Sequence, residues 1–199
     1  MNKTIYYKLL SLWSLLSIFQ LADAQSLDAI RQQYNDIHQD ISQQQKIENM
    51  RNYTELTLCH NVPGIGPQTI HYKLYFTPLA FNEDGELKPH RLLFVERKYN
   101  VAARSYYEEF LYDEKERPIF IYGREPREHS EEGIYIDTRC YFHEEVLLDM
   151  IITQVDKEGA QQLYRSSAEG QTPYVQKMLG QAHKIVGMFS AINKKAIPE

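Results

Sequence analysis

The sequence is poor in cysteine, with two in 199 residues, and it holds one tryptophan, nine glycines and eight prolines. So few cysteines exclude a small protein held together by many disulfides, and so few glycines exclude a collagen-like chain. Basic residues are outnumbered as well, since 22 Lys and Arg face 27 Asp and Glu, for a net charge of −5. That balance disfavours a nucleic-acid-binding protein, which usually carries a basic excess on one face. With 43% hydrophobic and 25% charged residues, the composition is globular and excludes a disordered chain.

Long hydrophobic runs are absent except for one near the start of the chain. The apolar run Leu9–Leu21 follows two positive residues, Lys3 and Lys8, and precedes the small residues of Ala22–Ala24. This order is typical of a secretory signal peptide and predicts cleavage before Gln25. The run is short for a transmembrane helix, which needs roughly 20 apolar residues.

Removal of residues 1–24 leaves residues 25–199, which we expect to form a single α+β domain without a membrane span. No cysteine precedes Cys59, so no thiol at the cleavage site is available to carry a lipid. The only tryptophan, Trp13, leaves with the signal. We therefore expect an exported protein, periplasmic or secreted, with no nucleic-acid partner.

A helix is predicted at each end of this domain. After Ser26, apolar side chains recur every three or four residues and predict an amphipathic helix to about residue 47. These are Leu27, Ile30, Tyr34, Ile37 and Ile41. Thr172 and Pro173 then supply a cap and a first turn for a C-terminal helix with a broad apolar stripe. That stripe comprises Val175, Met178, Leu179, Ala182, Ile185, Val186, Phe189 and Ile192.

Short alternating runs rich in Thr, Leu, Val and aromatic residues lie between the helices and predict about seven strands. They are Tyr53–His60, Thr69–Phe76, Arg91–Val101, Arg104–Asp113, Ile119–Tyr122, Ile134–His143 and Val146–Val155. Because short turns separate many of them, an antiparallel meander is favoured over parallel crossovers. The charged segment Gly123–Gly133 is expected to be a mobile loop, and the polar segment Glu158–Gln171 shows no clear periodicity.

The two cysteines allow two interpretations. In an exported protein two thiols tend to pair, and neighbouring strands would bring Cys59 and Cys140 together in a disulfide. Alternatively they are separate buried thiols, because Cys140 shares its strand face with Ile136 and Phe142. A metal site built from Cys59, His60, Cys140 and His143 is disfavoured, since adjacent residues of a strand point to opposite faces.

Sequence motifs for catalysis or for a cofactor are not found. The chain has no G-x-S-x-G elbow, phosphate-binding loop, dinucleotide fingerprint or H-E-x-x-H pair, and no cofactor is expected. Four acidic residues would suit acid/base chemistry: Glu96, Glu108, Glu109 and Asp137. Each has basic residues close in sequence, so cross-strand ion pairs on the sheet are the favoured interpretation.

Tyrosine is the unusual residue of this sequence, with 15 copies. Tyrosine suits a half-buried sheet, where the ring packs and the hydroxyl stays wet. The functional alternative is an aromatic platform for a sugar, a peptide or another ligand. Its candidate ligand-binding residues are Tyr99, Tyr106, Tyr112, Tyr122 and Tyr135. Both faces of the strand Arg104–Asp113 are partly apolar, so the sheet is expected to be covered on both sides or to hold a groove.

The end of the signal and the first residue after it (Ala22–Gln25), together with the run Tyr106–Gly123 (YYEEFLYDEKERPIFIYG), resemble small exported proteins of Bacteroidota envelopes. The resemblance implies a bacterial periplasmic or secreted origin and assigns no site residue. By fold analogy alone, cystatin-like and NTF2-like domains also combine helices with a curved sheet. The sequence thus favours a non-enzymatic exported domain that binds a ligand or an envelope protein through its tyrosine-rich sheet. The alternatives are an enzyme using carboxylates in a sheet cleft, and a structural or assembly factor of the envelope.

Overall fold

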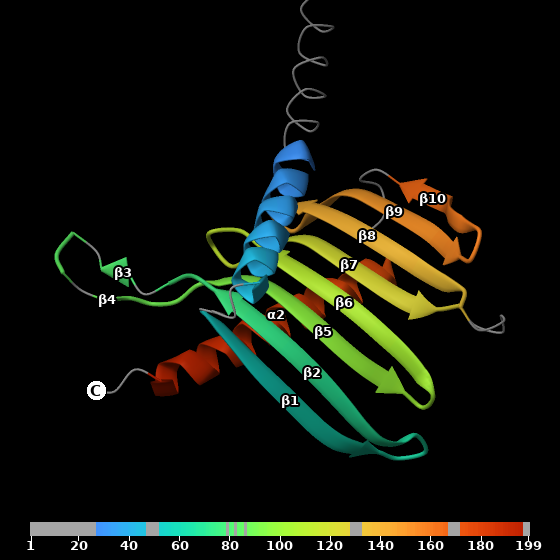
Figure 1. Ribbon diagram of the computed structural model, residues 1–199, viewed down its shortest axis with the longest axis horizontal. Helices are drawn as coiled ribbons and strands as arrows, with labels where there is room; N and C mark the ends of the chain where they lie inside the picture. The colour runs from blue at the N-terminus through green and yellow to red at the C-terminus, as the bar shows by residue number, and fades with distance from the viewer. Residues whose placement is uncertain are drawn as a thin grey trace, which may run out of the picture.

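An antiparallel meander of eight strands forms the centre of the computed structural model (Figure 1). The structure describes residues 27–46, 52–78, 80–81, 83–85, 87–127, 133–166 and 172–196, so the predicted signal peptide lies outside the described residues. The strands of this sheet, in spatial order, are β1 (Tyr53–Val62), β2 (Gly66–Phe76), β5 (Leu92–Val101), β6 (Arg104–Tyr112), β7 (Pro118–Pro126), β8 (Tyr135–His143), β9 (Val146–Asp156) and β10 (Gly159–Ser166). A small separate hairpin, β3 (Ala80–Phe81) and β4 (Leu87–Lys88), lies between β2 and β5 in the chain.

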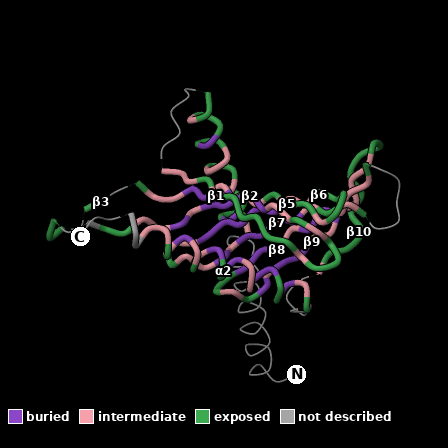
Figure 2. Tube along the Cα trace, turned by 90° about the horizontal axis from the view of Figure 1, so that it is seen from below, coloured by how far each residue is buried: buried purple, intermediate pink, exposed green. Residues whose placement is uncertain are grey.

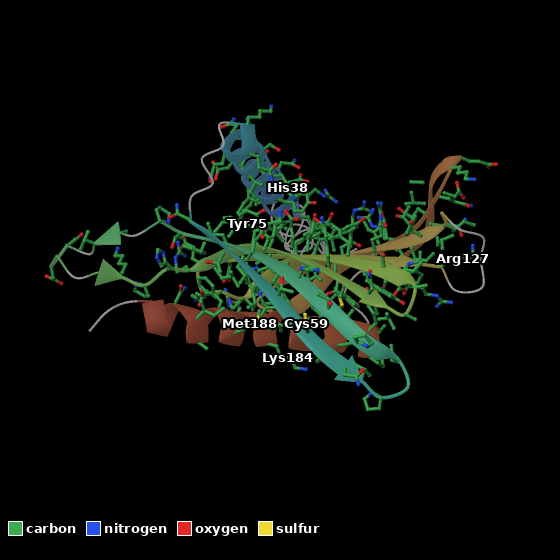
Figure 3. The ribbon with its side chains drawn as sticks, turned by 60° about the horizontal axis from the view of Figure 1, so that its bottom comes forward. His38, Cys59, Tyr75, Arg127, Lys184 and Met188 are labelled. Carbon is green, nitrogen blue, oxygen red and sulfur yellow. The ribbon has the colours of Figure 1, made fainter. Side chains whose placement is uncertain are left out.

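Two helices cover opposite faces of the sheet, which gives three layers (Figures 1 and 3). The N-terminal helix (residues 27–46) crosses one face, and α2 (Pro173–Ala196) runs across the other. The side chains of His38 and Tyr75 lie on the first side in Figure 3, whereas Lys184 and Met188 belong to α2 on the second. The expected α+β architecture, with a helix at each end of an antiparallel sheet, is confirmed.

The larger core lies between the sheet and α2. It buries the predicted C-terminal stripe, including Val175, Ala182 and Ile185, against sheet residues such as Phe110 and Phe142. Strand β7 passes closely beneath α2: a methyl group added at position 123 would lie 3.1 Å from the Tyr174 hydroxyl. A glycine at that position therefore allows the helix to approach the sheet.

A second core lies between the sheet and the N-terminal helix. Ile30 and Ile41 of the helix are buried against Phe94, Leu111 and Phe120 of the sheet. Strand β6 takes part in both cores, because Phe110 and Leu111 are neighbours in sequence and point to opposite faces. Buried positions consequently gather along the middle of the sheet, whereas β10 is largely exposed (Figure 2).

The structure extends the predicted strands at two places where a strand was not expected. Strand β7 continues to Pro126, because Gly123 and Arg124 keep their ladder partners in β6 and β8. The start of the expected loop Gly123–Gly133 is therefore sheet, and residues 128–132 lie outside the described residues. The polar segment Glu158–Gln171 contains β10, an exposed edge strand that pairs only with β9. An edge strand with little buried surface lacks the hydrophobic alternation by which strands are predicted.

The expected disulfide between Cys59 and Cys140 is corrected by the strand order. Both cysteines are free; Cys59 is exposed on β1 and Cys140 is buried on β8. Strands β2, β5, β6 and β7 lie between them. Five strand spacings of about 4.8 Å separate the two thiols by far more than the roughly 7 Å that a disulfide allows between Cα atoms. Burial raises the pKa of the Cys140 thiol to about 12, as expected for a thiol packed in a core.

Within the described residues, no helix combines the length and the apolar character needed to cross a membrane.

Candidate ligand-binding site

A cavity of about 550 Å³ lies between the N-terminal helix and strands β6, β7 and β8. The helix contributes one wall, and the sheet face that points toward the helix contributes the floor. The lining is mainly aromatic and charged: Ile30, Arg31, Tyr34, Asn35, Tyr107, Glu109, Phe120, Tyr122, Arg124, Arg139 and Tyr141. The volume falls within the roughly 300–1,000 Å³ of small-molecule sites.

A buried carboxylate joins the helix to the floor of this cavity. Glu109, whose side chain is 5% exposed, accepts hydrogen bonds from the Tyr34 hydroxyl at 2.6 Å and the Tyr107 hydroxyl at 2.5 Å. The Nε2 atom of His38 lies 3.8 Å from the same carboxylate, which is an ion-pair distance and too long for a hydrogen bond. The His38 ring packs against those of Tyr34 and Phe94. Glu109 thus fixes two cavity tyrosines, one from each wall.

The electrostatics of this cluster keep Glu109 ionised. Burial opposes ionisation, but His38 and the two tyrosine hydroxyls outweigh burial and lower the pKa of Glu109 below its usual 4.5. Burial also raises the pKa of Tyr34 and that of Tyr107, and the neighbouring Glu109 charge raises both further. The carboxylate is an acceptor and the phenols are donors at neutral pH, so this cluster has the protonation states of a structural hydrogen-bond network.

A second buried carboxylate, Asp137, organises the arginines of the floor. Arg124 donates two hydrogen bonds to it, from Nε at 2.7 Å and from a terminal nitrogen at 2.8 Å. Arg139 lies 3.8 Å from Asp137, and its guanidinium stands 5.3 Å from the centre of the Tyr122 ring. The two arginine side chains are 41% and 37% exposed, so both remain accessible from the cavity while the buried Asp137 carboxylate lies beside them. Burial and the Asp137 charge together raise the pKa of Tyr122 to about 12.

The lining residues themselves carry more positive than negative charge. They include three arginines, Arg31, Arg124 and Arg139, and one carboxylate, Glu109, while Asp137 pairs with Arg124 and Arg139 from beside the lining. Arg31 is fixed by Asp28 at 2.9 Å and stands over the Tyr141 ring at 5.4 Å. Guanidinium groups over aromatic rings present planar, bidentate donors that suit carboxylate and phosphate. The cavity therefore presents guanidinium groups and aromatic rings, with Asp28 and Asp137 holding the guanidinium groups in place.

The five tyrosines selected from the sequence lie in three different places. Tyr122 lines the cavity under the helix. Tyr99, Tyr106 and Tyr135 line an adjoining cavity near the β5–β6 turn. Tyr112 lies in the core with no exposed surface and donates a hydrogen bond to the Ala182 carbonyl of α2 at 3.2 Å, so it is a packing residue.

Sequence reasoning missed most of the residues that the structure brings together. Tyr34 was assigned to the apolar stripe of the helix, although its hydroxyl reaches Glu109. The available signal was the alternation Tyr135, Asp137, Arg139, Tyr141, which places rings and charges on one face of β8. An apolar face would be usual beneath a helix, so this pattern indicates a site.

The four acidic residues considered for acid/base chemistry are divided between the two faces and hold partners. Glu108 faces α2, where it accepts hydrogen bonds from Arg97 at 2.6 Å and from Tyr99 at 3.0 Å. Glu96 accepts one from the Tyr75 hydroxyl at 3.2 Å. Glu109 and Asp137 share the cavity side and are engaged as described above. The Arg97–Glu108 and Arg124–Asp137 contacts are the cross-strand ion pairs that the sequence favours, whereas tyrosine hydroxyls hold Glu96 and Glu109.

Among the described residues, no three His, Cys, Asp or Glu side chains come together as a metal site would require. Comparison of the chain with family models, with curated proteins and with solved structures found no match. We therefore infer a function from the chemistry of the cavity itself.

Proposed function

We propose that this protein is an exported binding module that holds a small anionic ligand between its N-terminal helix and strands β6, β7 and β8. The observation that carries the proposal is the cavity of about 550 Å³, whose lining combines tyrosines, three arginines and one glutamate. Ligand sites commonly combine an apolar or aromatic lining with a few fixed polar groups. Export follows from the predicted signal peptide and from the resemblance to envelope proteins of Bacteroidota.

The arrangement favours binding over carboxylate catalysis. A general base works best with a pKa near the working pH, whereas the pKa of Glu109 is lowered and two phenols occupy its oxygens. Asp137 accepts hydrogen bonds from two nitrogens of Arg124, one on each carboxylate oxygen. Both carboxylates hold other side chains in place, which is what a preorganised binding site requires.

The anionic preference comes from Arg139. Its guanidinium is beyond hydrogen-bond distance of Asp137, in contrast to that of Arg124. It can therefore turn its donors toward a ligand without breaking a close ion pair. Charge-assisted hydrogen bonds of this kind contribute roughly 1.5–3 kcal/mol each.

The proposal is tested by calorimetric titration of the protein with a panel of small carboxylates, phosphates and sulfonates, each paired with a neutral analogue of the same size. We expect at least one anion to bind and its neutral analogue to bind at least 10-fold more weakly, because one charge-assisted bond is worth about 1.4 kcal/mol or more. Arg139→Gln should weaken binding of that anion by a similar factor.

Arg117→Gln is the matched control, because Arg117 is also a partly exposed, ion-paired arginine but does not line the cavity. It should leave affinity unchanged, and circular dichroism should show both variants folded. Binding that is equal in wild type and Arg139→Gln, or a wild type that binds no member of the panel, would contradict the proposal.

A further inference from the structure

The cavity under the helix adjoins a second one at the end of the sheet where β5 turns into β6, and side chains of both sheet faces line this second cavity. The second cavity, of about 420 Å³, lies beside the turn between β5 and β6. Tyr107 and Arg124 line both cavities, so the two share a wall. We call the cavity under the helix the inner compartment and the one beside the turn the outer compartment.

The outer compartment repeats the chemistry of the inner one. Lys98 stands with its Nζ atom 5.3 Å from the centre of the Tyr107 ring, and the guanidinium of Arg124 stands 5.7 Å from that of Tyr135. Tyr99 and Tyr106 stack at 5.0 Å, with their planes 8° apart, on the α2 side of the same turn. Each compartment thus offers aromatic rings together with cations, and among the described residues no carboxylate lines the outer one.

The strand register sets the spacing between these groups. Tyr122 of β7 and Arg139 of β8 are cross-strand partners in the inner compartment, and Tyr107 of β6 and Arg124 of β7 are partners one strand across and two residues along β7. Residues two apart on a strand stand roughly 6.7 Å from each other on the same face. Ring and cation therefore recur at a regular interval, which suits a ligand that is itself a repeat.

Recognition on this surface is limited to side chains. Strands β6, β7 and β8 each pair with a neighbour on both sides, so their main-chain groups are bonded within the sheet. A peptide in extended form recognises a free sheet edge through its main chain, which this face does not offer. Pyranose rings present apolar C–H faces that pack on aromatic rings, and sugar acids add carboxylates for guanidinium and ammonium groups.

We propose that the ligand is an acidic oligosaccharide, a chain of uronic acid residues that occupies both compartments with at least one sugar in each. This inference rests on the proposed function, because it extends the site at which the anion binds. Linking two binding groups makes the second contact intramolecular, so a chain should bind more tightly than its single unit.

The test compares galacturonic acid with its di- and trisaccharide by calorimetric titration, using neutral maltotriose and tetraglutamate as competitors for the same site. We expect the trisaccharide to bind at least about 10-fold more tightly than the monosaccharide. The double variant Lys98→Ala with Tyr135→Phe alters only the outer compartment and should reduce that ratio toward one. Lys73→Ala is the matched control, since Lys73 is a partly exposed lysine of the neighbouring strand that lines neither compartment. It should leave the ratio unchanged.

The outcomes separate this inference from the proposed function. If galacturonic acid and its trisaccharide bind equally well, the extended site is refuted while an anion site under the helix stands. If tetraglutamate or maltotriose binds more tightly than the acidic trisaccharide, the ligand class is wrong. If no uronate binds, the inference fails, and the panel of small anions alone decides whether the inner compartment is a binding site.

Discussion

Replacing Glu109 with glutamine tests the network that holds the N-terminal helix against the sheet. The substitution keeps the shape of the side chain and removes its charge. The Tyr34 and Tyr107 hydroxyls, which donate to this carboxylate at 2.6 and 2.5 Å, then face a neutral amide. The Nε2 atom of His38, 3.8 Å from the carboxylate, also faces this amide.

The size of the effect follows from the two short hydrogen bonds. A hydrogen bond to an ionised carboxylate contributes roughly 1.5–3 kcal/mol, and a bond between neutral groups about 1 kcal/mol. In Glu109→Gln one hydroxyl donates to a neutral oxygen and the other faces an NH2 group that cannot accept its proton, because the two hydroxyls bind different carboxylate oxygens. Each change costs about 1 kcal/mol, so we expect the free energy of unfolding to fall by about 2 kcal/mol. The lowered pKa of Glu109 also predicts a loss of stability in the variant, because the contacts of the ionised form outweigh the cost of burial.

Urea unfolding at pH 7, followed by circular dichroism, measures this difference in free energy. In thermal unfolding at the same pH, Tm should fall by about 4–8 °C. A group whose pKa is lower in the folded state stabilises above its unfolded pKa, here near 4.5, and loses this contribution as pH falls through the folded pKa. Wild type and variant should therefore differ fully at pH 7 and converge as the pH falls below about 4.5.

The matched control is Glu114→Gln, an exposed glutamate in the β6–β7 turn, which should change stability by less than about 0.5 kcal/mol. The reasoning is refuted if Glu109→Gln is as stable as wild type at pH 7, or if the difference between the two proteins grows in acid.

Three further predictions concern the fold. Ile185 of α2 is 1% exposed, so Ile185→Ala should lower the free energy of unfolding in urea by about 2–5 kcal/mol. Lys184→Ala at the exposed neighbouring position should lower it by less than about 0.5 kcal/mol. Similar losses for the two variants would contradict the assigned core. In protein prepared without reductant, a thiol reagent should modify Cys59 in the folded state and Cys140 only after unfolding, and a protein without reactive thiols would contradict the free cysteines. Glu144→Asn with Glu145→Gly should raise the free energy of unfolding by about 1 kcal/mol, since both glutamates have positive φ (48° and 67°) in a two-residue turn; a lower urea midpoint would contradict this.

The elements that the sequence predicts well are those with strong periodicity. The helical stripes from Leu27 to Ile41 and from Val175 to Phe189 face the two cores as expected, because burial of an apolar stripe is what stabilises a surface helix. Adjacent residues of β6 are buried on both faces, as its sequence suggested. The β10 strand was missed because an exposed edge strand needs no hydrophobic pattern.

The candidate site was harder to predict because it joins segments far apart in the chain. Tyr34 and Glu109 are 75 residues apart, and no local pattern shows that a helix side chain will reach that carboxylate. The disulfide failed for a related reason, since the meander order places four strands between Cys59 and Cys140. Of the five tyrosines selected from the sequence, Tyr122 lines the cavity, whereas Tyr112 was misassigned because alternation does not show which face is filled by core.

The central claim is that an anion binds between the N-terminal helix and strands β6, β7 and β8. The most direct measurement is a titration of ¹⁵N-labelled protein with digalacturonate, following the backbone amide chemical shifts. The account predicts saturable shifts in residues 27–46 and in the segments Tyr107–Glu109, Tyr122–Arg124 and Asp137–Tyr141, with those shifts reduced in Arg139→Gln. Shifts confined to the edge strands β1 and β10, or saturable shifts that Arg139→Gln leaves intact, would contradict it.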